Sequence, residues 1–419
     1  MGRASGVLGW GRMMTSIRDH WRRGIGLGFA LVALGVAWTS ALWIRSDPDP
    51  DRLLALALAD HAAGRDDQAW DSLAKLAGLR EPTPADRMAR AQIRGALGEE
   101  ALPELALIPD DDPLAPAAHR LAGRVEVSRG RLRFAEPHFL AAIARNPQDP
   151  QPRRDLAFIY ALQHRLRELD DQFTALSDRN QLDDKLLLIW ARVRCGIWNP
   201  RSDLAPLEKA VAADPDDRLS RLALAGAYLL GNRIDDADRL LNSLPATDVE
   251  ARIHRIGIAM NRGDKDAAEA LLAGPEGSAD HPRLLQLRGM LAFTHQDIPK
   301  AAENFRAALA KDPTDRATQF GLGTALKLMG RPDEATPHLE AAHSQDAVGE
   351  LVRLAAVEKG SDDPTLARRL GIAWAKAGRR VEARGWLNLA IRQDPLDAEA
   401  QGALFDLDHP VAAADPTAR

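Results

Sequence analysis

Few residues of this 419-residue chain have the types and spacing that catalysis or metal binding requires. The only cysteine, Cys195, has no histidine close to it in the sequence that could activate its thiol as a nucleophile. His338 and His343 do not fall on one helical face, as a metal-binding pair on a helix would. No strand is expected before Gly321-Leu322-Gly323, so this stretch is not a phosphate-binding glycine loop. We therefore expect no catalytic residue, no metal site and no cofactor.

The other histidines and the paired acids have simpler explanations. His61, His119 and His254 are scattered along the chain and indicate no cluster. Asp183-Asp184 and Asp235-Asp236 stand where helices are expected to begin, and acidic residues at that end suit the helix dipole. An enzyme with an unrecognised site stays open as the less favoured alternative.

The composition is typical of a folded helical chain. Apolar residues make up 45% of the sequence and aromatic residues only 5%. The net charge of −5 is too balanced to indicate a protein that binds nucleic acid. A single cysteine excludes a disulfide within the chain.

The stretch at 24–44, GIGLGFALVALGVAWTSALWI, carries no charge and is long enough to cross a bilayer as a helix. Arg22 and Arg23 precede it and aspartates follow it, so the N-terminus should stay in the cytoplasm. Because the sequence is rich in Ala, Arg and Asp, we predict a single-pass protein of a bacterial inner membrane. Its basic segment at 1–23 would be cytoplasmic and the rest periplasmic. A cleaved signal peptide is the alternative.

The rest of the chain repeats one spacing of small, large and proline residues about every 34 residues. In the unit that starts at 116, Gly123, Ala135, Phe139 and Pro147 stand at positions 8, 20, 24 and 32. Other units repeat most of these residue types at the same positions. The predicted units start at residues 116, 150, 184, 218, 250, 282, 316 and 364.

This pattern resembles the tetratricopeptide repeat, a helix–turn–helix unit of about 34 residues. The resemblance implies an all-α fold, a right-handed superhelical solenoid of stacked hairpins that follows the single transmembrane helix. Small residues at positions 8, 20 and 27 should let the two helices of a hairpin approach closely. Large residues at positions 11 and 24 should fill the space between neighbours, and the proline at position 32 should end the second helix.

The repeat pattern also divides the chain beyond the membrane segment, because the last step between unit starts is longer than the others. The extra residues read as one inserted helix. The predicted regions are divergent repeats at 50–115, where Pro103 breaks a second helix, the main array at 116–345, the inserted helix at 346–360, a C-terminal repeat at 364–397, a capping helix at 398–408 and a disordered tail at 409–419.

In such a solenoid, the resemblance implies that first-helix side chains line a concave groove. Arginines beside apolar residues suit a peptide there, because guanidinium groups hold carboxylates. We therefore predict a protein or peptide partner, with an acidic segment or a C-terminal carboxylate as candidate ligands. The predicted groove residues are Arg120, Arg124, Arg154, Phe158, Lys185, Arg192, His254, Ile258, Asn261, Arg262, Gln286, Met290, Phe293, Phe320, Lys327 and Arg368.

The leading functional prediction is a membrane-anchored scaffold or adaptor that assists assembly of a cell-envelope complex. Similar anchored repeat proteins also suggest an assembly chaperone in cytochrome c maturation, or in polysaccharide export or secretion. Self-association through the ends of the array, or through the GxxxG pattern at Gly24 and Gly28, is a further alternative.

Overall fold

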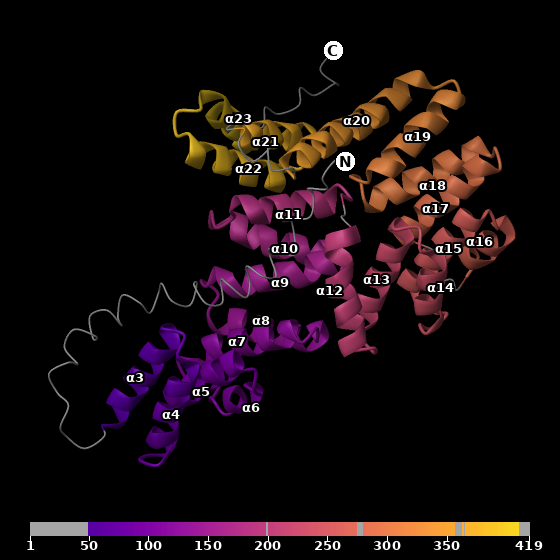
Figure 1. Cartoon of the computed structure of the whole chain (residues 1–419). Coiled ribbons are helices and arrows are strands. Elements are labelled where there is room, and N and C mark those ends of the chain that lie inside the picture. Colours follow the sequence, from indigo (N-terminus) through magenta and orange to yellow (C-terminus); the bar gives the residue numbers. More distant parts are fainter. Residues whose placement is uncertain (1–48, 198–199, 275–279, 357–362, 364, 410–419) are drawn as a thin grey trace, which may run out of the picture. The chain divides into compact units, whose positions relative to one another are not determined.

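The computed structural model describes residues 49–197, 200–274, 280–356, 363 and 365–409. Within these residues the regular structure consists of 21 α-helices and no strand (Figure 1). The predicted membrane segment, the basic segment before it and all but the first residue of the predicted tail lie outside the described residues. None of the described helices is both long and apolar enough to cross a membrane.

The described residues form two compact units. The first unit contains the described residues up to Ile159, together with Arg201–Asp217. Its helices are α3 (Pro50–Ala62), α4 (Asp66–Ala77), α5 (Pro84–Leu97), α6 (Leu102–Ala106), α7 (Ala115–Ser128), α8 (Leu132–Arg145), most of α9 (Pro150–Leu162) and nearly all of α12 (Pro200–Ala213).

The second unit contains Tyr160–Pro200 and the described residues from Arg218 onward. Its helices are α10 (Leu166–Ser177), α11 (Asp184–Arg194), α13 (Arg218–Leu230), α14 (Ile234–Asn242), α15 (Val249–Arg262), α16 (Lys265–Leu272), α17 (Pro282–Thr294), α18 (Ile298–Lys311), α19 (Arg316–Leu328), α20 (Pro332–Ala355), α21 (Leu366–Lys376), α22 (Arg380–Gln393) and α23 (Ala398–Asp408).

The predicted repeat units correspond to the helices of the structure. Each first helix, from α7 to α21, begins within about two residues of a predicted unit start. Within the units, α7 packs on α8, α13 on α14, α15 on α16, α17 on α18, α19 on α20 and α21 on α22. These pairs are the helix hairpins that the tetratricopeptide resemblance implies.

The glycine at position 8 faces the large residue at position 24 of its own hairpin. A Cβ added to Gly123 would lie 2.7 Å from the ring of Phe139, and one added to Gly289 would lie 2.6 Å from the ring of Phe305. Both distances are well below van der Waals contact, so only glycine lets these helices approach so closely. The predicted role of small residues at position 8 is confirmed in these hairpins.

The turn inside most hairpins contains one residue in the left-handed conformation, at position 15. Gly130 and Gly330 have φ angles of 79° and 75° there. Asn232 and Gln296 adopt the same conformation with φ angles of 57° and 61°, although they carry side chains that disfavour it. The left-handed turn is therefore a feature of the repeat itself, and glycine is the residue that adopts this conformation with the least strain.

Two helix boundaries differ from the prediction. The predicted inserted helix at 346–360 is not separate, because α20 is one helix of 24 residues that continues through Ala355. Ala347 stands at position 32 of this unit, where other units have the proline that ends the helix, so nothing stops α20 there. Pro103 does not break a helix either. It lies in the first turn of the short helix α6, where proline fits because no backbone N–H is needed.

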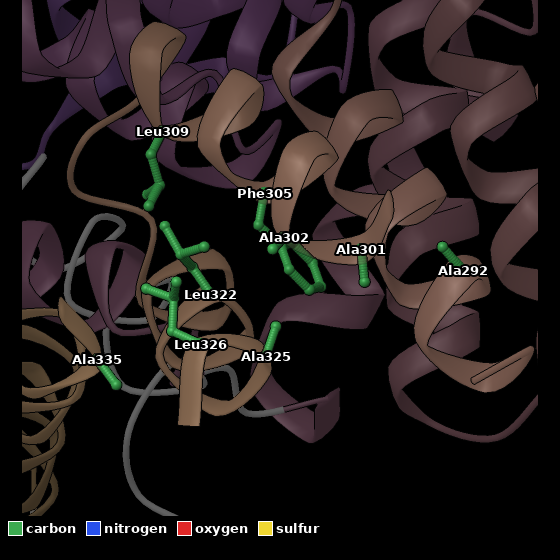
Figure 2. Close-up of a cluster of buried hydrophobic side chains, with 9 residues drawn as sticks. All are labelled: Ala292, Ala301, Ala302, Phe305, Leu309, Leu322, Ala325, Leu326 and Ala335. Atoms are coloured by element: carbon green, nitrogen blue, oxygen red, sulfur yellow. The ribbon is translucent and has the colours of Figure 1, made fainter. Parts of the chain in front are cut away.

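The core lies between stacked hairpins. Figure 2 shows the cluster around Phe305 of α18, whose ring points toward Ala325 of α19. A Cβ added to Gly321 of α19 would lie 2.8 Å from that ring, so Phe305 is held between α17 and α19. Two consecutive first helices are thus fixed against one shared aromatic side chain.

Candidate partner-binding surface

One stripe of predicted groove residues runs along α17. Gln286, Met290 and Phe293 are spaced by four and three residues, so they lie on the same helical face. Phe293 packs against the core around Phe305, whereas Met290 is 40% exposed. Gln286 is buried, and its Nε2 donates a hydrogen bond to Asp315, the N-cap residue of α19, at 2.6 Å. This contact joins the stripe on α17 to the beginning of the next first helix.

A second stripe runs along α19. Phe320 and Lys327 are seven residues apart and share one face of the helix. Phe320 is 45% exposed, and the guanidinium group of Arg316 lies over its ring at 5.5 Å. Arg316 also pairs with Asp346 of α20 at 2.8 Å, so the cation that covers one side of the ring is held in place. Lys327 is exposed at the far end of this stripe.

These two stripes of predicted residues lie on α17 and α19, two helices of the second unit that pack against each other. We call Gln286, Met290, Phe293, Phe320 and Lys327 the α17–α19 face. Its side chains lie on α17 and α19, and both helices pack against Phe305. This shared packing keeps the two helices in position without a ligand. Exposed methionine and aromatic side chains on a fixed support suit an apolar anchor residue of a protein partner.

Three predicted arginines already hold carboxylates of this chain. Arg120 donates to Asp155 of α9 at 2.9 Å. Arg262 pairs with two aspartates of α14, at 2.9 and 3.0 Å. Arg368 pairs with Asp397, the N-cap residue of α23, at 3.1 Å. A carboxylate of a partner would therefore have to compete with an aspartate of this chain for each of these three guanidinium groups.

The other predicted groove residues are spread over separate elements. Ile258 is buried in the core between α13 and α15 and cannot reach a partner. Burial lowers the pKa of His254, and burial also lowers the pKa of Arg124. The remaining predicted residues are half-buried or exposed on α9, α11 and α15, namely Arg154, Phe158, Lys185, Arg192 and Asn261.

Arginines have a role between hairpins that was not predicted from the sequence. Arg255 of α15 donates to three backbone carbonyl groups at and just after the end of α14, two of them at 2.7 and 2.8 Å. Arg288 of α17 donates to the last carbonyl group of α16 at 3.2 Å. The last carbonyl groups of a helix have no partner inside that helix, so a side chain from the next hairpin satisfies them. The signal in the sequence is an arginine at a similar place in successive first helices.

Asp183 and Asp235 have the helix-end positions that the sequence analysis assigned to them. Asp183 is the N-cap residue of α11, and its carboxylate accepts a hydrogen bond from the backbone N–H of Leu186 at 2.9 Å. Asp235 lies in the first turn of α14. Cys195 is half-buried at the end of α11, and burial raises the pKa of its thiol to about 12. In the part of the chain that the structure describes, no three His, Cys, Asp or Glu side chains group together to hold a metal ion.

Models of known protein families match three stretches of the sequence. Two family models, each described as tetratricopeptide repeat, match residues 204–256, and residues 287–347 with 333–398. The second pair of matches includes the whole α17–α19 face except Gln286. No curated protein matches this sequence.

Solved structures with a similar fold include a tetratricopeptide repeat protein from Parabacteroides merdae, at 15% identity and a TM-score of 0.32, which covers 66% of this chain and 98% of its own. The human IFIT1 dimer with PPP-AAAA has 17% identity and a TM-score of 0.37, and covers 85% of this chain and 87% of its own. Yeast Tom70 has 12% identity and a TM-score of 0.29, and covers 94% of this chain and 96% of its own. With its matched helix hairpins, the chain carries tetratricopeptide repeats in an all-α fold that is suited to protein–protein interaction.

Proposed function

We propose that this protein is a scaffold or adaptor that binds a segment of a partner protein on the α17–α19 face. The observation that carries the proposal is the exposure of Met290 and Phe320, at 40% and 45%, on two helices that a common core holds together. Water contact with large apolar side chains is unfavourable, and burying them against a partner recovers about 25 cal/mol per Å².

The chemistry of the face indicates what the partner segment should contain. An aliphatic or aromatic side chain would cover Met290 and Phe320, and an acidic residue a few positions away would meet Lys327. An acidic segment or a C-terminal carboxylate agrees with the charge of Lys327. The apolar anchor is nevertheless the main determinant, since a single exposed ion pair contributes little.

The test places a photocrosslinking amino acid at Phe320 in the full-length protein in cells, followed by identification of what is captured. The matched control position is Leu354, which is 40% exposed. It lies on α20, the second helix of its hairpin, and is not part of the α17–α19 face. We expect capture of a defined partner from position 320, and loss of that capture when Met290→Ala is added. Equal yields of the same products from positions 320 and 354 would remove the basis of the proposal.

We also propose that residues 24–44 anchor the protein in a bacterial inner membrane and that the repeats lie in the periplasm, near envelope complexes under assembly. The uncharged stretch and the arginines before it support this topology. A reporter enzyme that is active only outside the cytoplasm, fused after Arg419, should be active. The protein should also leave the membrane fraction when residues 1–44 are deleted. An inactive reporter on a stable fusion would contradict the topology, whatever the binding face does.

A further inference from the structure

Two helices from the middle of the sequence pack against the C-terminal helices of the second unit. α11 packs against α20 and α22, and α10 packs against α22 (Figure 1). One hydrogen bond across this contact, from Nη2 of Arg392 to the carbonyl oxygen of Leu182 at 2.6 Å, joins residues that are 210 positions apart. In a linear repeat array each repeat contacts only its neighbours. This contact is therefore additional to the stacking of hairpins.

The apolar part of the contact depends on one glycine. Leu182 lies just before α11 and Leu187 lies within it, and both are buried. A Cβ added to Gly385 of α22 would lie 2.7 Å from Cδ2 of Leu187 and 3.4 Å from Cδ1 of Leu182. The bare backbone at Gly385 thus lets the leucines reach α22, and any larger side chain there would stand in their place.

The polar part of the contact centres on Arg194, at the end of α11. Its guanidinium group pairs with the buried Glu382 of α22 at 3.3 Å and with Asp170 of α10. Asp170 also accepts a hydrogen bond from Nε1 of Trp190 at 2.8 Å, and the Trp190 ring stacks on Phe173 at 4.9 Å. These contacts hold α10 and α11 to each other. They also fix the position of Arg194, which pairs with Glu382 of α22.

We propose that α10 and α11 form a clasp that docks on α20 and α22, holds the second unit closed, and can release without unfolding the hairpins. The hairpins from α13 to α20 have their own buried cores, which do not include the clasp residues. The contacts of the clasp with α22 include those at Gly385, Glu382 and Arg392, so changes at these residues should shift its equilibrium. It does not depend on the partner-binding function proposed above.

The single cysteine is a natural probe of this clasp. Cys195 follows Arg194 at the end of α11, and its charged neighbours include Arg353 of α20 and Glu382 of α22. Burial between these elements raises the pKa of the thiol to about 12, from an ordinary value of 9.0. Only the thiolate reacts with disulfide reagents, and its fraction rises as the pKa falls while its nucleophilicity decreases, so release of the clasp should increase the labelling rate at pH 8 by about 30-fold.

The first experiment uses a wedge in the purified full-length chain. In Gly385→Phe, the ring takes the place of Leu187 and should release the clasp, which we follow by the rate at which Cys195 reacts with an aromatic disulfide reagent. The matched control is Gly402→Phe on α23, where an added Cβ meets nothing within 4 Å. We expect a rate increase of at least about tenfold for the wedge only, with unchanged helix content.

The second experiment does not rely on the wedge folding correctly. Arg392→Ala removes a surface side chain that bonds across the clasp, and Arg384→Ala removes one from the same helix that pairs with Asp408 instead. A charge-assisted hydrogen bond of this kind corresponds to about a tenfold change in the opening equilibrium. We expect about tenfold faster labelling, and faster hydrogen exchange in α11, for Arg392→Ala alone. The same rate and exchange in both arginine variants would overturn the clasp.

Discussion

Replacing Gly289 by alanine should destabilise the protein, even though alanine is the better helix former. In a helix interior alanine is favoured over glycine by about 1 kcal/mol. At Gly289, however, the new Cβ would lie 2.6 Å from two atoms of the Phe305 ring. The ring has little room to retreat, because it also packs on Gly321 of α19, where an added Cβ would lie 2.8 Å from it. We expect an overpacking cost near the upper end of the usual range, about 3 kcal/mol, and a net loss of about 2 kcal/mol.

Gly257 provides the matched comparison. It occupies position 8 of its own unit on α15, yet an added Cβ there would meet nothing within 4 Å. The reason is that position 24 of this unit is Ala273, which follows the short helix α16, instead of a large side chain. Gly257→Ala should therefore stabilise the protein by about 0.5–1 kcal/mol, through helix propensity alone.

The measurement is urea unfolding of the two variants and the parent chain, followed by far-ultraviolet circular dichroism. The two substitutions are chemically identical and both lie in first helices, so their difference isolates the contact with Phe305. We expect midpoints that move in opposite directions, with a separation equivalent to about 3 kcal/mol. If Gly289→Ala raised the midpoint as Gly257→Ala does, the steric explanation of position 8 would be refuted.

Three further predictions follow from the same structure. Gln296→Gly should stabilise the left-handed turn by about 1 kcal/mol and Gly330→Gln should destabilise the equivalent turn by about as much, as measured by urea unfolding. Asp248→Ala should cost about 1–2 kcal/mol at pH 7, because it removes the N-cap of α15 and an ion pair with an arginine of α13. That arginine lowers the pKa of Asp248 in the folded protein. The stability that the ionised Asp248 contributes is therefore fully present above the ordinary aspartate pKa, and it is lost as the pH falls through the lowered pKa of the folded state. The unfolding free energies of parent and variant should accordingly converge in acid. Arg255→Met should cost about 1–3 kcal/mol by removing the side-chain donor to three carbonyl groups at and just after the end of α14. Arg262→Met on the same helix should cost less than about 1 kcal/mol, because its ion pairs are exposed.

The repeat spacing predicted much of the fold because it records contacts between neighbouring segments. Positions 8 and 24 are close in the sequence, and their residues meet in several hairpins, as Gly289 and Phe305 do, so the pattern carries their contact. The predicted separate helix at 346–360 was wrong, although the absence of a proline at Ala347 is a signal that α20 continues. The packing of α11 on α22 could not be predicted in this way. A contact between Leu187 and Gly385 occurs once, so it leaves no periodic trace.

The arginines show why the binding residues were harder to predict than the fold. Stacked hairpins leave carbonyl groups at helix ends and N-cap carboxylates facing the next hairpin, and an arginine satisfies either one. Arg218 and Asp248, 30 residues apart, and Arg368 and Asp397, 29 residues apart, are such pairs at one repeat of separation. A basic residue in a first helix is therefore informative about a ligand only when no acid stands one repeat further along the chain. Lys327 is exposed on α19 and forms no ion pair within the described residues, which is why it remains in the proposed binding face while most of the arginines do not.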